Sequence, residues 1–195
     1  RAGLPFALAA GGFLALHFAF WITSLSYTSV AASTALVTTN PVWVTLLGWW
    51  LFGERPSFLT LLGVGVALLG GVLIGLGDSE GGGGANPLLG DFLALLGAVA
   101  ASCYFLLGRE AQRRGLSTWA YVRVAYTAAA LLLLPLPYLF GGGYGGYPLE
   151  VYAYLLLMAL LPQLVGHTSF NWATRHIPPV LVTLAILFEP VGASL

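Results

Sequence analysis

The sequence predicts an all-α membrane protein with seven transmembrane helices. Of its 195 residues, 58% are hydrophobic and only 7% are charged, whereas a soluble domain carries about 25% charged residues. So few charges cannot cover a water-facing surface. Several uncharged apolar runs also reach the roughly 20 residues that a helix needs to cross a bilayer. We therefore expect the lipid bilayer to surround most of this chain.

Short polar or glycine-rich connections separate the apolar segments from one another. The turn "GERPS" ends the second segment, and Pro56 stands near the start of the third. The loop "GLGDSEGGGGANP" is glycine-rich and flexible, and it divides the chain into two halves. The predicted spans, in order, cover residues 4–25, 28–52, 58–76, 87–107, 118–140, 148–172 and 179–195.

The distribution of arginine supports seven spans. The chain has no lysine, and this topology puts every arginine on one side of the membrane or close to it, while the other side holds only acidic residues. Positive charge marks the cytoplasmic side of a membrane protein. The arginines predicted to be cytoplasmic are Arg1, Arg55, Arg109, Arg113, Arg114 and Arg175, and Arg123 lies within the fifth span near the same side.

Composition excludes several classes of function. The formal net charge is zero, so we expect no nucleic-acid partner. One cysteine, Cys103, allows neither an internal disulfide nor a thiolate zinc cluster. Without lysine there is no Schiff-base chemistry, and we expect no cofactor, no metal and no catalytic residue. Loose matches to intramembrane proteases, at "GLGD" and "GAS", lack the partner residues that such enzymes require.

The two halves contain a weak internal duplication. The segment "SLSYTSVAASTALVTTNPV" aligns with "ATRHIPPVLVTLAILFEPV", so that Asn40-Pro41 matches Glu189-Pro190. An odd number of spans separates the copies, so they cross the membrane in opposite directions. Inverted repeats of this kind are typical of transporters, which bind their substrate near the midplane between the repeats.

The duplication also predicts the organisation of a longer protein. The first copy continues beyond Pro41 through a further helix, whereas the second stops soon after Pro190. We therefore expect this chain to be a fragment of a ten-helix bundle of two five-helix repeats. Residues 1–77 are the end of the first repeat, 78–86 an extracytoplasmic linker, and 87–195 a truncated second repeat.

Three motifs resemble the EamA-type transporters of the drug/metabolite transporter superfamily. They are the helix "YTSVAAS" leading to proline, the "GERPS" turn before a glycine-rich helix, and "FEPV" in the second copy. The segment "GDFLALLGAVAASCYFLLGREAQRRG" is similar as well, and the resemblance covers essentially the whole chain. It implies a carrier in a bacterial or archaeal inner membrane that exports amino acids or other small metabolites from a central cavity.

Polar and aromatic residues at helical spacing are the candidate substrate contacts. His17, Trp21 and Ser24 share one face of the first span, and Gln163, His167 and Asn171 form an i, i+4, i+8 stripe on the sixth. The alternative is a packed core with interhelical hydrogen bonds. Further candidates are Thr38 and Asn40 beside the proline kink and the ring of Tyr104.

Glu189 is an acidic residue in the middle of an apolar segment. A charged carboxylate costs roughly 3 kcal/mol or more at that depth, so a functional role is expected of it. We predict that Glu189 couples transport to protons; the alternative is a neutral acid that satisfies the backbone freed by Pro190.

We thus expect a secondary transporter for a small molecule, working by alternating access. The alternative is a polytopic membrane protein with a receptor or assembly role. Small residues at every fourth position, Gly63, Ala67, Gly71 and Gly75, favour close helix packing within the repeat or in a homodimer.

Overall fold

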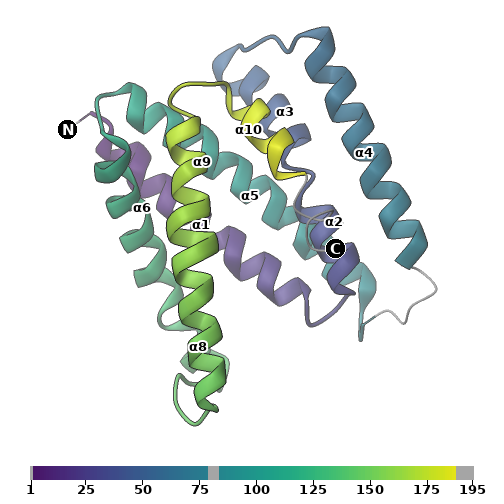
Figure 1. Ribbon diagram of the computed structural model, residues 1–195, viewed down its shortest axis with the longest axis vertical. Coiled ribbons are helices and arrows are strands. Elements are labelled where there is room, and N and C mark those ends of the chain that lie inside the picture. The colour runs from purple at the N-terminus through teal and green to yellow at the C-terminus, as the bar shows by residue number, and fades with distance from the viewer. Residues whose placement is uncertain (1, 79–83, 188–195) are drawn as a thin grey trace.

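The computed structural model describes residues 2–78 and 84–187, and every regular element in these two ranges is helical (Figure 1). The first half of the chain supplies α1 (Leu4–Ser24), α2 (Val30–Val37), α3 (Asn40–Phe52) and α4 (Phe58–Asp78). The second half supplies α5 (Pro87–Arg113), α6 (Thr118–Leu133), α7 (Leu136–Leu139), α8 (Leu149–Met158), η1 (Ala159–His167), α9 (Thr168–Ala173) and α10 (Pro179–Ile186).

Five helical segments are long and apolar enough to cross a membrane. They are Leu4–Ser24, Val30–Phe52, Pro87–Arg113, Thr118–Leu139 and Leu149–Ala173. They confirm a multi-pass α-helical protein, because only helices that satisfy their own backbone, or closed barrels, can span lipid. The third expected span forms the helix α4. The described part of the seventh is α10, and Glu189 and Pro190 lie outside the described residues.

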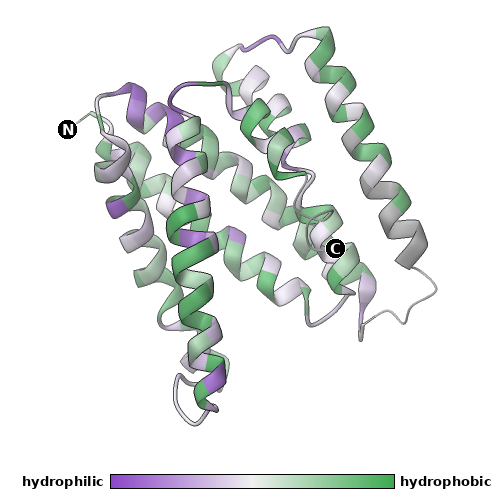
Figure 2. Cartoon of the chain, in the orientation of Figure 1, coloured by the Kyte–Doolittle hydropathy of each residue, from purple (hydrophilic) through white to green (hydrophobic). Residues whose placement is uncertain are grey.

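Hydrophobic residues occur along most of the helices (Figure 2), and many of them are exposed. The helical run from α8 through α9 carries exposed leucines along much of its length, including Leu155, Leu156 and Leu161. A water-soluble protein would hide such a surface, whereas lipid solvates it. The exposed apolar surface therefore agrees with the membrane location that the composition predicts.

Helix α5 is central in the bundle and packs against α1, α2, α3, α6, α9 and α10. Small residues on its buried face, among them Ala94, Ala98 and Ala101, let the neighbouring helices approach closely. At Gly90 an added Cβ would lie 2.7 Å from the Thr28 backbone nitrogen. No side chain fits there, which explains glycine at this position.

The second predicted span is broken at its proline, as its sequence predicts. The helix stops after Val37 and resumes at Asn40. Proline cannot donate a backbone hydrogen bond, so carbonyls in the preceding turn lose a partner. Thr38 Oγ1 donates to the carbonyl oxygen of Thr34 at 2.8 Å and of Ala35 at 3.1 Å. These bonds add a side-chain donor in the turn before the break, and the Val37 carbonyl oxygen, four residues before Pro41, accepts from the Asn40 amide at 2.8 Å.

Helices α3 and α10 pack against each other and run in opposite directions. In Figure 1 the α3–α4 turn and the α9–α10 connection lie at the same end of the bundle, so α3 ends where α10 begins. Helix α1 likewise runs toward the end at which α8 starts. The alignment pairs α10 with α2, the first helix of the span that α3 completes, and α1 with the span that begins at α8, so the paired spans run in opposite directions.

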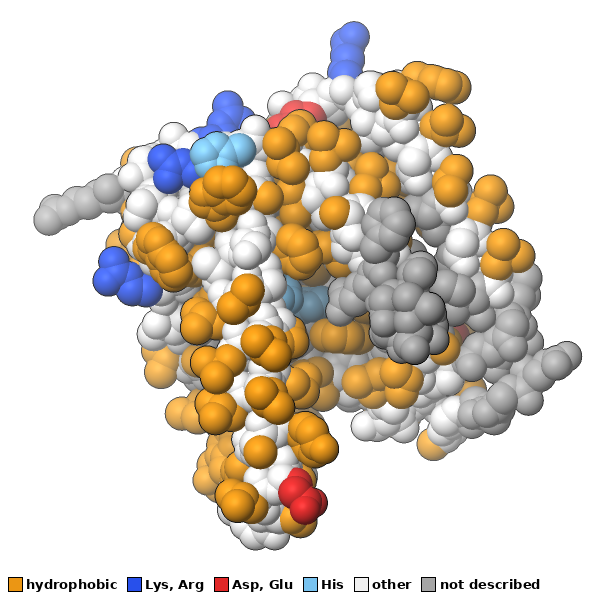
Figure 3. All heavy atoms as spheres, viewed as in Figure 1, with side chains coloured by type: hydrophobic (Ala, Val, Ile, Leu, Met, Phe, Trp, Pro, Cys, Tyr) orange, Lys and Arg blue, Asp and Glu red, His pale blue; other side chains and the backbone are white. Residues whose placement is uncertain are grey.

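The arginine side chains gather toward one end of the molecule. Figure 3 shows them in blue along the upper part of the view, while the lower end of α8 carries an acidic side chain. Glu150 stands in the first turn of α8. The described arginine side chains thus lie toward one end of the bundle, as the predicted topology requires.

Helix α5 extends further than its sequence suggested. We expected the fourth span to stop at 107, but the helix continues to Arg113 and ends before Gly115, which has φ of +97°. Leu, Arg, Glu, Ala and Gln are all good helix formers, and arginine in the last turn favours the negative end of the helix dipole. The extension places Arg109 inside the helix.

Candidate functional site

A cavity of about 60 Å³ lies inside the bundle, between helices from both halves of the chain. We call it the inner cavity. Most of the predicted substrate contacts line it: His17, Trp21, Thr38, Asn40, Tyr104 and His167. The rest of its lining is Thr34, Val37, Ala101, Phe105, Phe170 and Ile186.

His17 is held in a defined orientation at the inner cavity. Its Nδ1 atom donates to the carbonyl oxygen of Gly97 at 2.9 Å, since that oxygen can only accept. In the neutral ring, Nε2 is then the acceptor. The imidazole also stacks on Trp21 with ring centroids 5.7 Å apart and planes inclined by 23°. His17 therefore presents a fixed ring whose Nε2 atom has no hydrogen-bond partner among the described residues.

Two other polar atoms of the cavity lining are buried without a partner among the described residues. They are Nε1 of Trp21 and Nδ1 of His167. An indole N–H can only donate, and leaving it unpaired in a buried site costs about 1–3 kcal/mol. A ligand or a water molecule that accepts a hydrogen bond would satisfy Trp21, which makes these atoms the strongest signs of a binding site.

Asn40 closes the break before Pro41. In the amide orientation that satisfies its hydrogen bonds, its nitrogen donates to the carbonyl oxygens of Val37 at 2.8 Å and Ala98 at 3.1 Å. Its backbone oxygen accepts from Ser102 Oγ at 3.3 Å. The proline break is therefore tied to α5, and the cavity wall is rigid at this point.

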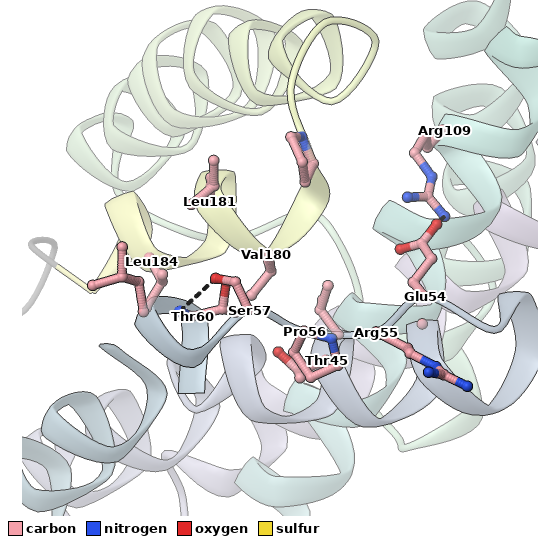
Figure 4. A pocket seen from close by; sticks show the side chains of 14 residues that line it. Thr45, Glu54, Arg55, Pro56, Ser57, Thr60, Arg109, Val180, Leu181 and Leu184 are labelled. Atoms are coloured by element: carbon pink, nitrogen blue, oxygen red, sulfur yellow. Dashed lines mark hydrogen bonds and ion pairs between the residues drawn. The ribbon is translucent and has the colours of Figure 1, made fainter. Parts of the chain in front are cut away.

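A second, larger cavity of about 720 Å³ lies between α3, α4, α5 and α10, toward the end of the bundle that carries the arginines (Figure 4). We call it the outer cavity. Glu54 from the α3–α4 turn and Arg109 from α5 form an ion pair beside it, with Oε1 and Nη2 2.5 Å apart. The exposed side chain of Arg55 and the apolar side chains of Val180, Leu181 and Leu184 also line it.

The family model for EamA-like transporters matches this chain over residues 2–76 and 88–195. The chain belongs to the EamA-like transporter family. This confirms the resemblance seen in the "YTSVAAS", "GERPS" and "FEPV" motifs, and the family is one of transporters, not of enzymes. No solved structure matches the chain.

Curated relatives of this EamA-like protein carry transporter names. An uncharacterized transporter of Clostridium kluyveri is 26% identical over 96% of this chain and 61% of its own length. A probable terminal-alkyne amino-acid exporter of Streptantibioticus cattleyicolor is 27% identical over 83% of this chain and 53% of its own length. An uncharacterized transporter of Synechocystis is 23% identical over 88% and 51%. The chain thus spans about half to three fifths of the length of these relatives.

Asn171 of this EamA-like chain supports the inner cavity from behind. Its side chain is fully buried, and Nδ2 donates to the hydroxyl of Tyr104 and to that of Tyr126, the latter at 3.2 Å. The Tyr126 hydroxyl is also 3.2 Å from Thr168 Oγ1. Asn171 does not line the cavity; it positions Tyr104, which does.

The stripe predicted on the sixth span is not regular in this EamA-like protein. Pro162 lies within η1, a π-helical stretch whose wider turns rotate each residue relative to an α-helix. His167 consequently reaches the inner cavity and Asn171 packs against α5, whereas Gln163 lies outside the cavity lining. Regular α-helical spacing does not predict this placement of Gln163, because Pro162 removes a backbone hydrogen-bond donor and the helix is π-helical there.

Ser24, another predicted contact, does not line the inner cavity. Ser24 is buried where α1 meets α2, with its hydroxyl 2.6 Å from Ser33 Oγ and donating to the Trp21 carbonyl oxygen at 2.6 Å. Its bonds hold two helices together. Glu189 lies outside the described residues, so its role stays a prediction.

The described cavity linings define what the site can bind. No charged side chain is among the inner-cavity residues, and the charges of the outer cavity are those of Glu54, Arg55 and Arg109. In the described ranges, 2–78 and 84–187, no three histidine, cysteine or acidic side chains meet as metal ligands would. The inner cavity is suited to hydrogen-bonding and stacking with a small organic molecule.

Proposed function

We propose that the full-length protein is a secondary transporter that exports a small metabolite or an amino acid across the inner membrane by alternating access. The observation that carries this proposal is the inner cavity, where Trp21 Nε1 and His167 Nδ1 are buried without protein partners among the described residues. Such groups are costly in lipid unless a ligand or water binds them. The curated amino-acid exporter from Streptantibioticus cattleyicolor supports an amino acid as one candidate substrate.

The opposite directions of the span that α2 and α3 form and of α10, which aligns with α2, support a pair of inverted repeats. We propose that residues 1–77 and 87–195 belong to two repeats of a ten-helix bundle, joined by an extracytoplasmic linker at 78–86. Rocking of one repeat against the other then exposes the inner cavity to each side in turn. The arginine-bearing end faces the cytoplasm in this arrangement.

Six residues of the inner cavity form the proposed substrate site. Trp21 and His167 offer unpartnered polar atoms, His17 offers Nε2, and Tyr104 and the aromatic rings provide stacking surfaces. Thr38 and Asn40 shape the wall at the proline break. Glu189 follows α10 in the chain, and we propose that it exchanges protons during transport; the homodimer also remains a proposal.

Countertransport in proteoliposomes tests this function. The full reading frame that contains this chain would be purified, reconstituted and loaded with amino acids and small metabolites one at a time. We expect uptake of at least one labelled solute only when the same solute is inside, and loss of that uptake in His167→Phe. A receptor or assembly factor would exchange no solute, so folded protein without countertransport of any panel member would contradict the proposal.

A further inference from the structure

The outer and inner cavities are successive spaces along the same three helices. On α5, Phe105 lines the inner cavity and Arg109 the outer one, and these positions are about one helical turn apart. Helix α3 passes from Asn40 to Val44 in the same way, and α10 lines the inner cavity with Ile186. A molecule in the outer cavity is therefore about one turn away from the proposed transport site.

Arg109 is a buried cation with unused hydrogen-bonding capacity. Only 8% of the residue is exposed, and its guanidinium lies 5.3 Å from the centre of the Phe52 ring. Glu54 contacts Nη2, whereas Nε is buried with no partner among the described residues. A guanidinium carries five N–H donors in a fork that matches a carboxylate. Because Glu54 contacts only Nη2, the guanidinium still has N–H groups that could donate to a second carboxylate.

The two members of this ion pair differ in their freedom to move. The Glu54 side chain is 40% exposed and stands on a turn, whereas the Arg109 side chain is 10% exposed and belongs to a long helix. The carboxylate can turn into water and be solvated there, but the guanidinium cannot leave without disrupting α5. Arg109 is therefore the fixed partner, and Glu54 is the exchangeable one.

We propose that Arg109 is a carboxylate-binding site of the outer cavity, at which the carboxylate of an incoming solute replaces that of Glu54. Figure 4 shows the Glu54 carboxylate directed at the Arg109 guanidinium, at the edge of the cavity. The volume of about 720 Å³ is large enough for a small organic acid. Leu181 and Leu184 provide an apolar wall for the rest of the molecule. The assignment rests on the proposed function, because it makes the outer cavity the route to the inner one.

The hydroxyl groups of Thr45, Ser57 and Thr60 around the outer cavity already take part in hydrogen bonds within the protein. Thr45 Oγ1 donates to the Pro41 carbonyl oxygen at 2.6 Å, and Ser57 Oγ lies 2.9 Å from Thr60 Oγ1. Arg55 also lines the cavity but is exposed, so water and salt screen its charge. The strongest attraction for an anion in the described cavity is therefore at Arg109.

Calorimetric titration with benzoate and benzamide tests this site. The two probes have the same phenyl ring, but benzoate carries a carboxylate where benzamide carries an uncharged amide. The full-length protein would be kept in an uncharged maltoside detergent. We expect benzoate to bind and benzamide not to bind. Glu54→Gln removes the competing carboxylate and should tighten benzoate binding on the order of tenfold, while Arg109→Gln should abolish it.

The second ion pair of α5 supplies the control. Glu110 pairs with Arg114 at 2.7 Å near the same end of the helix but outside the outer cavity. Glu110→Gln changes the net charge as Glu54→Gln does, and it should leave the benzoate affinity unchanged. Equal binding of the two probes, no binding of benzoate, or no gain in Glu54→Gln would overturn the assignment.

These results are separable from those for transport. Countertransport of uncharged solutes by a protein that fails to bind benzoate would contradict the proposed Arg109 site but not the proposed transport function. Benzoate binding with the expected variant pattern, but without countertransport of any solute, would keep the site and remove the proposed function.

Discussion

The Nδ1 atom of His17 donates to the carbonyl oxygen of Gly97, which joins the middle of α1 to α5 across the two halves of the chain. A Cβ at position 97 would lie 3.4 Å from the Trp21 Cβ, which is van der Waals distance, so α1 and α5 are closely packed here. One hydrogen bond thus fixes the tautomer of His17 and holds the ring at the inner cavity. The proposed site depends on this contact between the halves.

Replacing His17 by phenylalanine should separate function from packing. His17→Phe retains an aromatic ring beside Trp21 but loses the bond to Gly97 and the free Nε2. We expect countertransport to fall at least tenfold, while stability in mixed micelles falls by only about 0.6–2 kcal/mol. His176→Phe is the control, since His176 is exposed in the α9–α10 connection. Equal transport by the two variants would remove His17 from the site.

The indole nitrogen of Trp21 should contribute to substrate affinity. Trp21→Phe removes the unpartnered Nε1 with little change in the rest of the ring, so the fold should be retained. A lost hydrogen bond of about 1–1.5 kcal/mol predicts roughly a tenfold higher KM for the transported solute. Trp172→Phe provides the comparison, because Trp172 is 59% exposed and does not line the inner cavity. An unchanged KM in Trp21→Phe would mean that the solute does not accept from this atom.

Adjacent glycines on α1 should differ sharply in their tolerance of a side chain. A Cβ at Gly11 would lie 2.6 Å from the Ala125 carbonyl oxygen on α6, whereas nothing lies within 4 Å of a Cβ at Gly12. Gly11→Val should therefore destabilise the bundle by about 1–3 kcal/mol through overpacking, and Gly12→Val much less. Unfolding in mixed micelles measures both. Equal stability of the two variants would contradict the packing of α1 on α6.

Replacing Asn171 should lower the stability of the bundle, because its side chain donates to two tyrosine hydroxyls. Asn171→Leu leaves the hydroxyls of Tyr104 and Tyr126 without their donor, at a cost of about 1–2 kcal/mol. Ser169→Ala is the control on the same helix, because Ser169 is exposed and donates only to the Val165 carbonyl oxygen at 2.7 Å. Equal stability of Asn171→Leu and Ser169→Ala would contradict a structural role for these hydrogen bonds.

Periodicity and composition predicted much of this protein, because lipid imposes simple rules on a chain. The helical class, the break before Pro41 and the family all follow from residues that can be read directly. The meeting of His17, Trp21 and His167 also agrees with the expectation that polar residues in an apolar bundle face its interior.

The remaining features depend on departures from regular helices. Pro162 produces π-helical turns, so Gln163 does not lie on the face expected from α-helical spacing. The apolar run predicts a helix end at 107, which would put Arg109 in a loop, whereas α5 continues to Arg113. The available signal was the spacing of four residues between Phe105 and Arg109, which puts both on the buried face once the helix is extended.

Thiol labelling tests most directly whether the inner cavity is reached from both sides of the membrane. Cys103 is the only cysteine of these 195 residues. Cys103→Ser, with every cysteine of the full-length protein outside them replaced as well, gives a background for Ala101→Cys in the cavity wall. The buried control is Ala98→Cys, which does not line the cavity. We predict that a membrane-impermeant reagent modifies Cys at position 101 in intact cells and in inverted vesicles, that transported solute slows both reactions, and that position 98 stays unmodified. Labelling of position 101 from one side only, or from neither, would contradict alternating access to this cavity.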